Sequence, residues 1–124
     1  MSESKLHVLL VGGEPYMKDV AEVMMSSLGH TIAAEPHVTQ AVERATRGEE
    51  AFDLYMVDVE GPEGLATITR MREHPRTAGA PILCLANERN ARQIELALRA
   101  GASHALRLPF KRQDLAAAIA TAIP

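Results

Sequence analysis

The sequence predicts an α/β fold in which helices cover both faces of a five-stranded parallel sheet. Five short apolar runs alternate along the chain with five segments whose apolar residues recur at helical spacing. The apolar runs are nearly continuous, which is typical of strands buried on both faces. With 124 residues, the chain has the length of one domain with one core. We therefore predict a single domain over residues 1–124.

The first two strand–helix units are bounded by proline and glycine. We expect a strand over Leu6–Val11, then a helix that begins at Pro15 and ends before Gly29, because proline favours the first helical turn and glycine the helix end. A second strand is expected at Thr31–Ala34, and a second helix at Val38–Thr46. The side chains of the first helix that recur at helical spacing are Met17, Val20, Ala21, Met24 and Leu28.

The third unit combines a strand at Leu54–Val57 with a helix at Gly64–Glu73. The fourth combines Ile82–Leu85 with a helix at Arg89–Ala100, and the fifth combines His104–Leu108 with a helix at Lys111–Ile123. The side chains expected to face the core from these three helices are Leu65, Ile68, Met71, Ile94, Ala97, Leu98, Leu115, Ala118, Ile119 and Ala122.

Right-handed crossovers leave few topologies for five such units, and the common one at this size is a flavodoxin-like, three-layer sandwich with strand order 2-1-3-4-5. This order places the carboxyl ends of the first and third strands side by side. Ligand sites of open α/β sheets form at that edge. Gly12, Gly13 and Glu14 should therefore meet Asp58 in one crevice.

Composition narrows the possible functions. The net charge of −3 argues against nucleic acid as a general partner, although a local basic patch could escape this average, and the absence of tryptophan removes stacking platforms for single strands. No apolar run reaches the length of a membrane span and no signal-peptide core follows Met1, so we expect a cytoplasmic protein that does not bind membranes. The start at Met1 favours a stand-alone domain or an N-terminal module.

No catalytic or metal-binding motif is visible. The lone Cys84 lies in an apolar run, and no histidine pair has metal-ligand spacing. Gly12-Gly13 matches neither the P-loop nor the dinucleotide fingerprint. A small anion could still bind at this glycine pair, which opens into a helix N-terminus. We expect no enzyme activity.

Several segments, in order and at matching intervals, resemble a response-regulator receiver domain of the CheY-like kind. They are Val8-Leu9-Leu10-Val11, the run from Asp53 to Pro62, Pro81-Ile82-Leu83-Cys84-Leu85, Ala100-Gly101-Ala102 and Leu108-Pro109-Phe110. The resemblance covers nearly the whole chain. It implies the flavodoxin-like fold, bacterial two-component signalling and a phospho-acceptor role for Asp58.

The remaining site positions depart from the family pattern, which makes the chain resemble an atypical or pseudo-receiver. The acidic pair that binds metal in the family falls on Gly12 and Gly13, followed by Glu14. Glu60 would offer a metal only its backbone carbonyl. The residues at the positions of the hydroxyl that senses the phosphoryl group, the aromatic switch and the lysine are Ala86, Ala105 and Leu108.

These departures should disable phosphorylation. Transfer of a phosphoryl group requires its charge to be neutralised, largely by Mg²⁺ and a cationic side chain. Loss of one such contact costs about 3–4 kcal/mol, or roughly 10²–10³ in rate. We therefore expect weak or absent Mg²⁺ binding, no other cofactor, and a raised pKa for Asp58 if it is buried and unpaired.

Three interpretations of Asp58 stay open. It can be a residual strand-end carboxylate that accepts backbone hydrogen bonds, a working phospho-acceptor with Glu14 supporting the metal, or part of a site for another ligand. The first interpretation leads to a domain that works through protein–protein contact, independent of phosphorylation.

Six basic residues gather in the last third of the chain, on the expected fourth helix, fifth strand and fifth helix. In receiver domains this face is the usual docking surface, for partners such as a histidine kinase or an effector domain. Glu88 and Glu95 are interspersed, so a solvated, salt-bridged face is one alternative. Another is an arginine-rich site for a nucleotide second messenger such as cyclic di-GMP. The six residues are Arg89, Arg92, Arg99, Arg107, Lys111 and Arg112.

Overall fold

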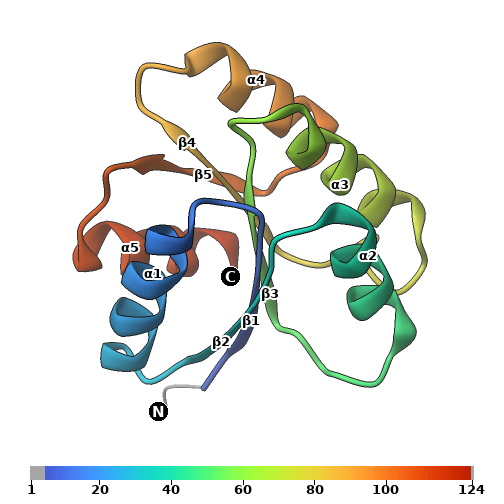
Figure 1. Ribbon diagram of the computed structural model, residues 1–124, viewed down its shortest axis with the longest axis horizontal. Coiled ribbons are helices and arrows are strands. Elements are labelled where there is room, and N and C mark those ends of the chain that lie inside the picture. Colours follow the sequence, from blue (N-terminus) through green and yellow to red (C-terminus); the bar gives the residue numbers. More distant parts are fainter. Residues whose placement is uncertain (1–4, 124) are drawn as a thin grey trace.

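The computed structural model describes residues 5–123, in which five strands and five helices alternate (Figure 1). The strands are β1 (His7–Val11), β2 (Thr31–Glu35), β3 (Leu54–Asp58), β4 (Ile82–Asn87) and β5 (His104–Leu108). The helices are α1 (Pro15–Ser27), α2 (Val38–Arg47), α3 (Pro62–Glu73), α4 (Ala91–Ala100) and α5 (Arg112–Ala122). All strand pairs are parallel and the order is β2-β1-β3-β4-β5, which confirms the predicted fold class.

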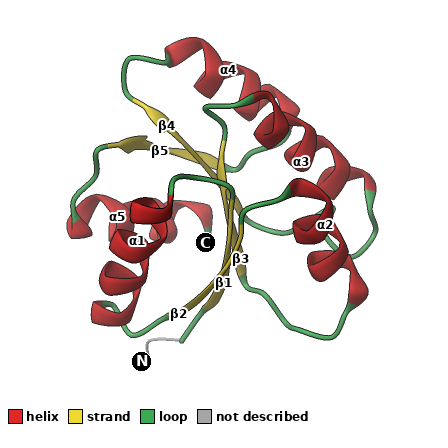
Figure 2. Cartoon of the chain, in the orientation of Figure 1, coloured by secondary structure: helices red, strands yellow, loops and turns green. Residues whose placement is uncertain are grey.

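The sheet is covered on both faces, with α1 and α5 on one side and α2, α3 and α4 on the other (Figures 1 and 2). A hydrophobic core lies on each face of the sheet, and alternate residues of β1 contribute to the two cores. Val8 and Leu10 pack under α1 and α5, and Leu9 and Val11 pack under the other three helices. This double burial explains why the strands are continuously apolar. Each such side chain contributes about 1.5–3 kcal/mol to folding through its burial.

The largest differences from the predicted bounds lie beside the crevice. β4 extends to Asn87, α3 begins at Pro62 and α4 begins only at Ala91, so Arg89 lies in the loop after β4. Proline is well suited to the first helical turn because its missing N–H would have no partner there. Gly64 therefore lies inside α3, where it packs against the backbone of Asp58 and Val59.

Leu98, which was predicted to face the core, is exposed, and so is Val20, one of the residues at helical spacing in the first helix. Val20 keeps 40 % of its surface accessible and Leu98 keeps 43 %. In α1 the buried stripe is Met17, Ala21 and Met25. A second apolar stripe, formed by Tyr16, Val20 and Val23, faces outward on the same helix. The sequence pattern contained both stripes and did not indicate which one the sheet would cover.

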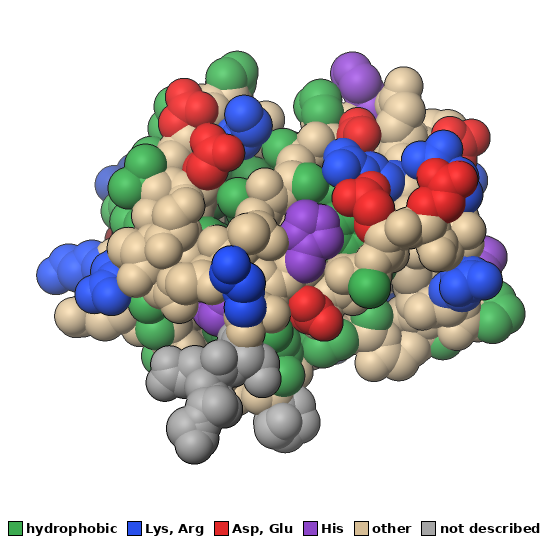
Figure 3. Space-filling view, turned by 90° about the horizontal axis from the view of Figure 1, so that it is seen from below, with side chains coloured by type: hydrophobic (Ala, Val, Ile, Leu, Met, Phe, Trp, Pro, Cys, Tyr) green, Lys and Arg blue, Asp and Glu red, His purple; other side chains and the backbone are tan. Residues whose placement is uncertain are grey.

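The surface carries charges of both signs. On the face shown in Figure 3, acidic and basic side chains lie close together rather than in separate patches. Arg44 pairs with Glu35, and Arg47 pairs with Glu49. No helix in the described part of the chain combines the length and the apolar character that a membrane crossing requires.

Candidate functional site

Asp58 ends β3, where the turns that follow β1 and β3 meet. Its side chain is half-buried, and Oδ1 accepts a hydrogen bond from the backbone N–H of Glu60 at 2.9 Å. The turn after β1 lies against it, because a Cβ atom built on Gly13 would be 3.6 Å from Asp58 Oδ2. The structure thus brings the glycine pair and the carboxylate together at the carboxyl edge of the sheet.

The glycine pair adopts backbone conformations that few other residues tolerate. Gly12 has a φ of +77° and Gly13 a φ of +91°, both in the left-handed region. An L-residue with a side chain is strained there. The backbone of this turn is therefore suited to glycine.

The residues present do not fit a magnesium ion. Mg²⁺ requires near-octahedral oxygen ligands at about 2.0–2.1 Å, and neither glycine supplies a side-chain oxygen. Within residues 5–123, no group of three histidine, cysteine or acidic side chains lies close enough to hold a metal ion. Glu14 precedes α1 as its N-cap residue and does not complete such a group.

The Asp58 carboxyl lies close to two other carboxylates. Burial raises the pKa of this carboxyl above its ordinary value, the backbone N–H of Glu60 opposes the shift, and the nearby carboxylates of Glu60 and Glu14 add to it. Between residues 5 and 123, no basic side chain forms an ion pair with Asp58. Leu108, which the sequence resemblance predicts at the position of the lysine, packs against the core under α1 and α5.

The Glu60 side chain joins the loops that follow β3 and β4. Its Oε1 accepts a hydrogen bond from the backbone N–H of Asn87 at 2.6 Å, and its Oε2 accepts one from Asn90 Nδ2 at 3.1 Å. Gln93 in α4 adds a third link by donating to the carbonyl oxygen of Val59 at 2.6 Å. We call the two hydrogen bonds from Asn87 and Asn90 to the Glu60 carboxylate the Glu60 tether.

Sequence reasoning missed the tether. It assigned Glu60 only a backbone role and did not single out Asn87, Asn90 or Gln93. Of the two residues bound to Glu60, only Asn90 uses its side chain, whereas Asn87 donates its backbone N–H and its side chain accepts a hydrogen bond from the backbone N–H of Arg89.

The two alanines that the sequence resemblance predicts at the switch positions have different environments. Ala86 is fully buried in β4, and Ala105 is partly buried in β5. A hollow of about 340 Å³ lies along β5 and α5, bordered by Ala105, Arg107, Asp114 and Ala117. Neither alanine can move a hydroxyl or a ring in response to Asp58.

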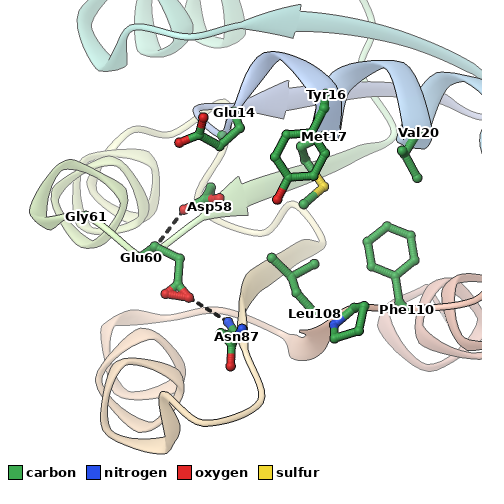
Figure 4. Close-up of a pocket in the computed structure, with 12 residues that line it drawn as sticks. Glu14, Tyr16, Met17, Val20, Asp58, Glu60, Gly61, Asn87, Leu108 and Phe110 are labelled. Atoms are coloured by element: carbon green, nitrogen blue, oxygen red, sulfur yellow. Dashed lines mark hydrogen bonds between the residues drawn. The ribbon is translucent and has the colours of Figure 1, made fainter.

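A larger cavity of about 700 Å³ lies beside Asp58, between α1, the loops after β1, β3 and β4, and the segment that joins β5 to α5. Figure 4 shows carboxylates at one end and apolar side chains at the other. The acidic end is Glu14, Asp58 and Glu60, and the apolar end is Tyr16, Met17, Val20, Leu108, Pro109 and Phe110. Sequence reasoning missed the apolar end, although the spacing of Tyr16 and Val20 places them on one helix face.

The six basic residues do not all lie on one face. Arg92 and Arg99 are exposed on α4, where Arg99 pairs with Glu95 at 3.4 Å, and Arg107 is exposed on β5. Arg112 instead directs its guanidinium at α1, where Nε donates to Ser27 Oγ at 2.8 Å. Arg112 thus interacts with the neighbouring helix α1. Lys111 immediately precedes α5 as its N-cap residue.

Cys84 is fully buried in β4, and burial raises the pKa of its thiol to about 11. The thiol therefore stays protonated and unreactive at neutral pH, as the apolar run around it predicted.

Comparisons with known proteins agree with this geometry. The family model for the response regulator receiver domain matches residues 8–120. A two-component response regulator of Arabidopsis thaliana, ARR22, is 26 % identical over 113 residues, which are 89 % of this chain and 78 % of that protein.

Solved structures show the same fold. The receiver domain of the sensor histidine kinase PA1611 from Pseudomonas aeruginosa, solved with magnesium in its active-site cleft, superposes with a TM-score of 0.81 and 28 % identity over 92 % of this chain and 93 % of that one. A putative response regulator from Chloroflexus aurantiacus gives a TM-score of 0.85 at 23 % identity over 94 % and 95 % of the two chains. The match of the family model over residues 8–120 shows that this chain belongs to the family of response regulator receiver domains, and the strand order and the position of Asp58 agree with it.

Proposed function

We propose that this receiver domain of two-component signalling works as a docking module whose partner binding does not require phosphorylation of Asp58. Receiver domains contact signalling proteins such as kinases and effectors. In this proposal, the unmodified chain is already in its binding-competent form. It assigns the domain no enzymatic activity and no resident metal.

The Glu60 tether carries the proposal. In receiver domains of the usual kind, a phosphoryl group on the aspartate draws a hydroxyl of β4 toward it, and this chain has Ala86 there. Here Glu60 is a permanent negative group beside Asp58, and it already holds the N–H of Asn87 at 2.6 Å. Hydrogen bonds to charged groups contribute about 1.5–3 kcal/mol when shielded and less when exposed. The loop after β4 therefore has one preferred position without any modification.

The docking surface in this proposal is formed by α4, β5 and α5. Arg92, Arg99 and Arg107 are exposed there, and the hollow beside Ala105 offers room for a side chain of the partner. Arg99 pairs with Glu95, whereas Arg92 and Arg107 form no ion pair within residues 5–123. These two guanidinium groups favour an acidic partner surface, because arginine pairs with carboxylates through two parallel hydrogen bonds. A kinase or an effector domain with such a surface fits the proposal.

A capture experiment compares a variant at Asp58 with a variant of the docking surface. The tagged domain, its Asp58→Asn variant and its Arg92→Glu/Arg107→Glu variant are each used to recover partners from extracts of the native host, with quantification by mass spectrometry. Arg70→Glu, which reverses the charge of an exposed arginine on α3, serves as the control for a charge reversal outside the docking surface.

The proposal expects Asp58→Asn and Arg70→Glu to recover the wild-type set of partners and the double variant to lose it. Loss of the partners with Asp58→Asn while the variant stays folded would contradict it. That result would favour a conventional phospho-acceptor.

A further inference from the structure

We propose that the cavity beside Asp58 binds a small organic cation that carries an ammonium group on a hydrocarbon chain. This inference goes beyond docking, because it concerns a free small molecule at the carboxyl edge of the sheet rather than a protein on the face of α4, β5 and α5. The cavity has a volume of about 700 Å³, which falls in the range of small-molecule sites, roughly 300–1,000 Å³.

The apolar end of the cavity suits a hydrocarbon chain. Leu108 lies where most receiver domains carry a lysine, and Phe110 packs beneath α1 with Met17. Val20 and Tyr16 complete this wall from α1 and are 40 % and 63 % exposed. A hydrocarbon chain that covers these side chains gains about 25 cal/mol for each Å² of apolar surface removed from water.

The acidic end suits a cation that is larger than a metal ion. Asp58 Oδ2 and both oxygens of Glu14 accept no hydrogen bond from any residue between 5 and 123. Among residues 5–123, no lysine, arginine or histidine lines the cavity. An ammonium group can donate up to three hydrogen bonds at about 2.7–2.9 Å, so it can bridge carboxylates that do not converge on one metal ion.

The aromatic side chains extend the apolar surface that the hydrocarbon chain would cover. Figure 4 shows the Tyr16 ring and the Phe110 ring on the apolar side of the cavity, across from the carboxylates. The same carboxylates repel phosphates, so this cavity does not suit a nucleotide or another anion.

The test uses n-hexylammonium as the probe. The labelled full chain is titrated at neutral pH while the amide resonances of Gly13, Glu60, Asn87 and Phe110 are followed by NMR. Hexanol and hexanoate, which share the chain length, and methylammonium, which lacks the hydrocarbon chain, are titrated in parallel. We expect saturable shifts of these amides with hexylammonium and weaker or no binding of the other three.

Two variants test whether binding of hexylammonium depends on the cavity residues, and a third variant is the control. Asp58→Asn should weaken hexylammonium binding by about tenfold, because a lost charge-assisted hydrogen bond is a contribution of that size. Leu108→Lys should abolish it by placing a tethered ammonium group in the cavity. Asp19→Asn removes an equal charge from the exposed surface of α1 outside the cavity and should leave binding unchanged.

A further titration distinguishes a free small ligand from a lysine side chain of a partner protein. A short peptide with one central lysine is titrated under the same conditions. Equal binding of hexanol, equal weakening by Asp58→Asn and Asp19→Asn, or binding of the lysyl peptide without binding of hexylammonium would overturn the proposal.

Discussion

The carboxylate of Glu60 accepts a hydrogen bond from the backbone N–H of Asn87 across the carboxyl edge of the sheet, with 2.6 Å between Oε1 and N. This contact joins the loop after β3 to the end of β4. It is made between groups of the unmodified chain, so it forms without a phosphoryl group on Asp58.

Removing the Glu60 carboxylate should loosen the loop after β4. We expect Glu60→Ala to lower the free energy of unfolding by about 1 kcal/mol, because both hydrogen bonds are solvent-exposed. Hydrogen exchange at the Asn87 amide should become faster. Glu60→Gln retains an amide oxygen as acceptor and should have a smaller effect.

Glu88→Ala is the matched control, since Glu88 is an exposed neighbour on the loop after β4. Unchanged exchange at Asn87 in Glu60→Ala would show that the tether does not fix the loop.

Gly64 lets α3 approach the end of β3. A Cβ atom there would collide with the backbone of Asp58 and lie 2.8 Å from the Cα atom of Val59. We expect Gly64→Ala to cost about 3 kcal/mol, the upper end for overpacking. Gly61→Ala is the control, because nothing lies within 4 Å of its added Cβ atom. Urea denaturation of both variants tests the contrast, and equal midpoints would contradict it.

Asp58 should make the domain less stable as the pH rises. Burial raises the pKa of the folded-state carboxyl above its ordinary value of 3.8, so the folded state holds this proton more tightly than the unfolded chain. By linkage, stability falls as the pH rises from that ordinary value through the raised folded-state pKa. Asp58→Asn removes the ionisable group and should stabilise the domain at neutral pH.

The gain should be on the order of 0.5 kcal/mol, because solvent screens a half-exposed carboxylate. Thermal denaturation at neutral pH and below pH 4 measures it, and the difference between wild type and Asp58→Asn should shrink at the acidic pH. A variant that is less stable than wild type at neutral pH would contradict the account.

Restoring the family's acidic pair should not restore a metal site. Gly12→Asp/Gly13→Asp forces two side chains into left-handed backbone conformations, at a cost of roughly 1–2 kcal/mol each. Calorimetry with Mg²⁺ should detect no tight binding to this double variant, and urea denaturation should show reduced stability. Tight Mg²⁺ binding at unchanged stability would show that the turn adapts without strain.

The fold could be predicted from the sequence because continuous apolar strands and glycine or proline boundaries restrict the topology strongly. The outward position of Val20 and Leu98 could not, since each helix carries more apolar residues than its buried stripe needs. The meeting of Asp58 with the turn at Gly13 followed from strand order alone. The Glu60 tether depends on loop conformations that no periodic pattern encodes.

An NMR titration of the labelled domain with Mg²⁺, followed by beryllofluoride as a mimic of the phosphoryl group, tests the central claim most directly. The account predicts no saturable shifts at Asp58, because no metal site and no cation neutralise the added group, and an unchanged loop after β4. Saturable shifts at Asp58 that spread to Ala86, Ala105 and α4 would contradict it, because they would show a working phosphorylation switch.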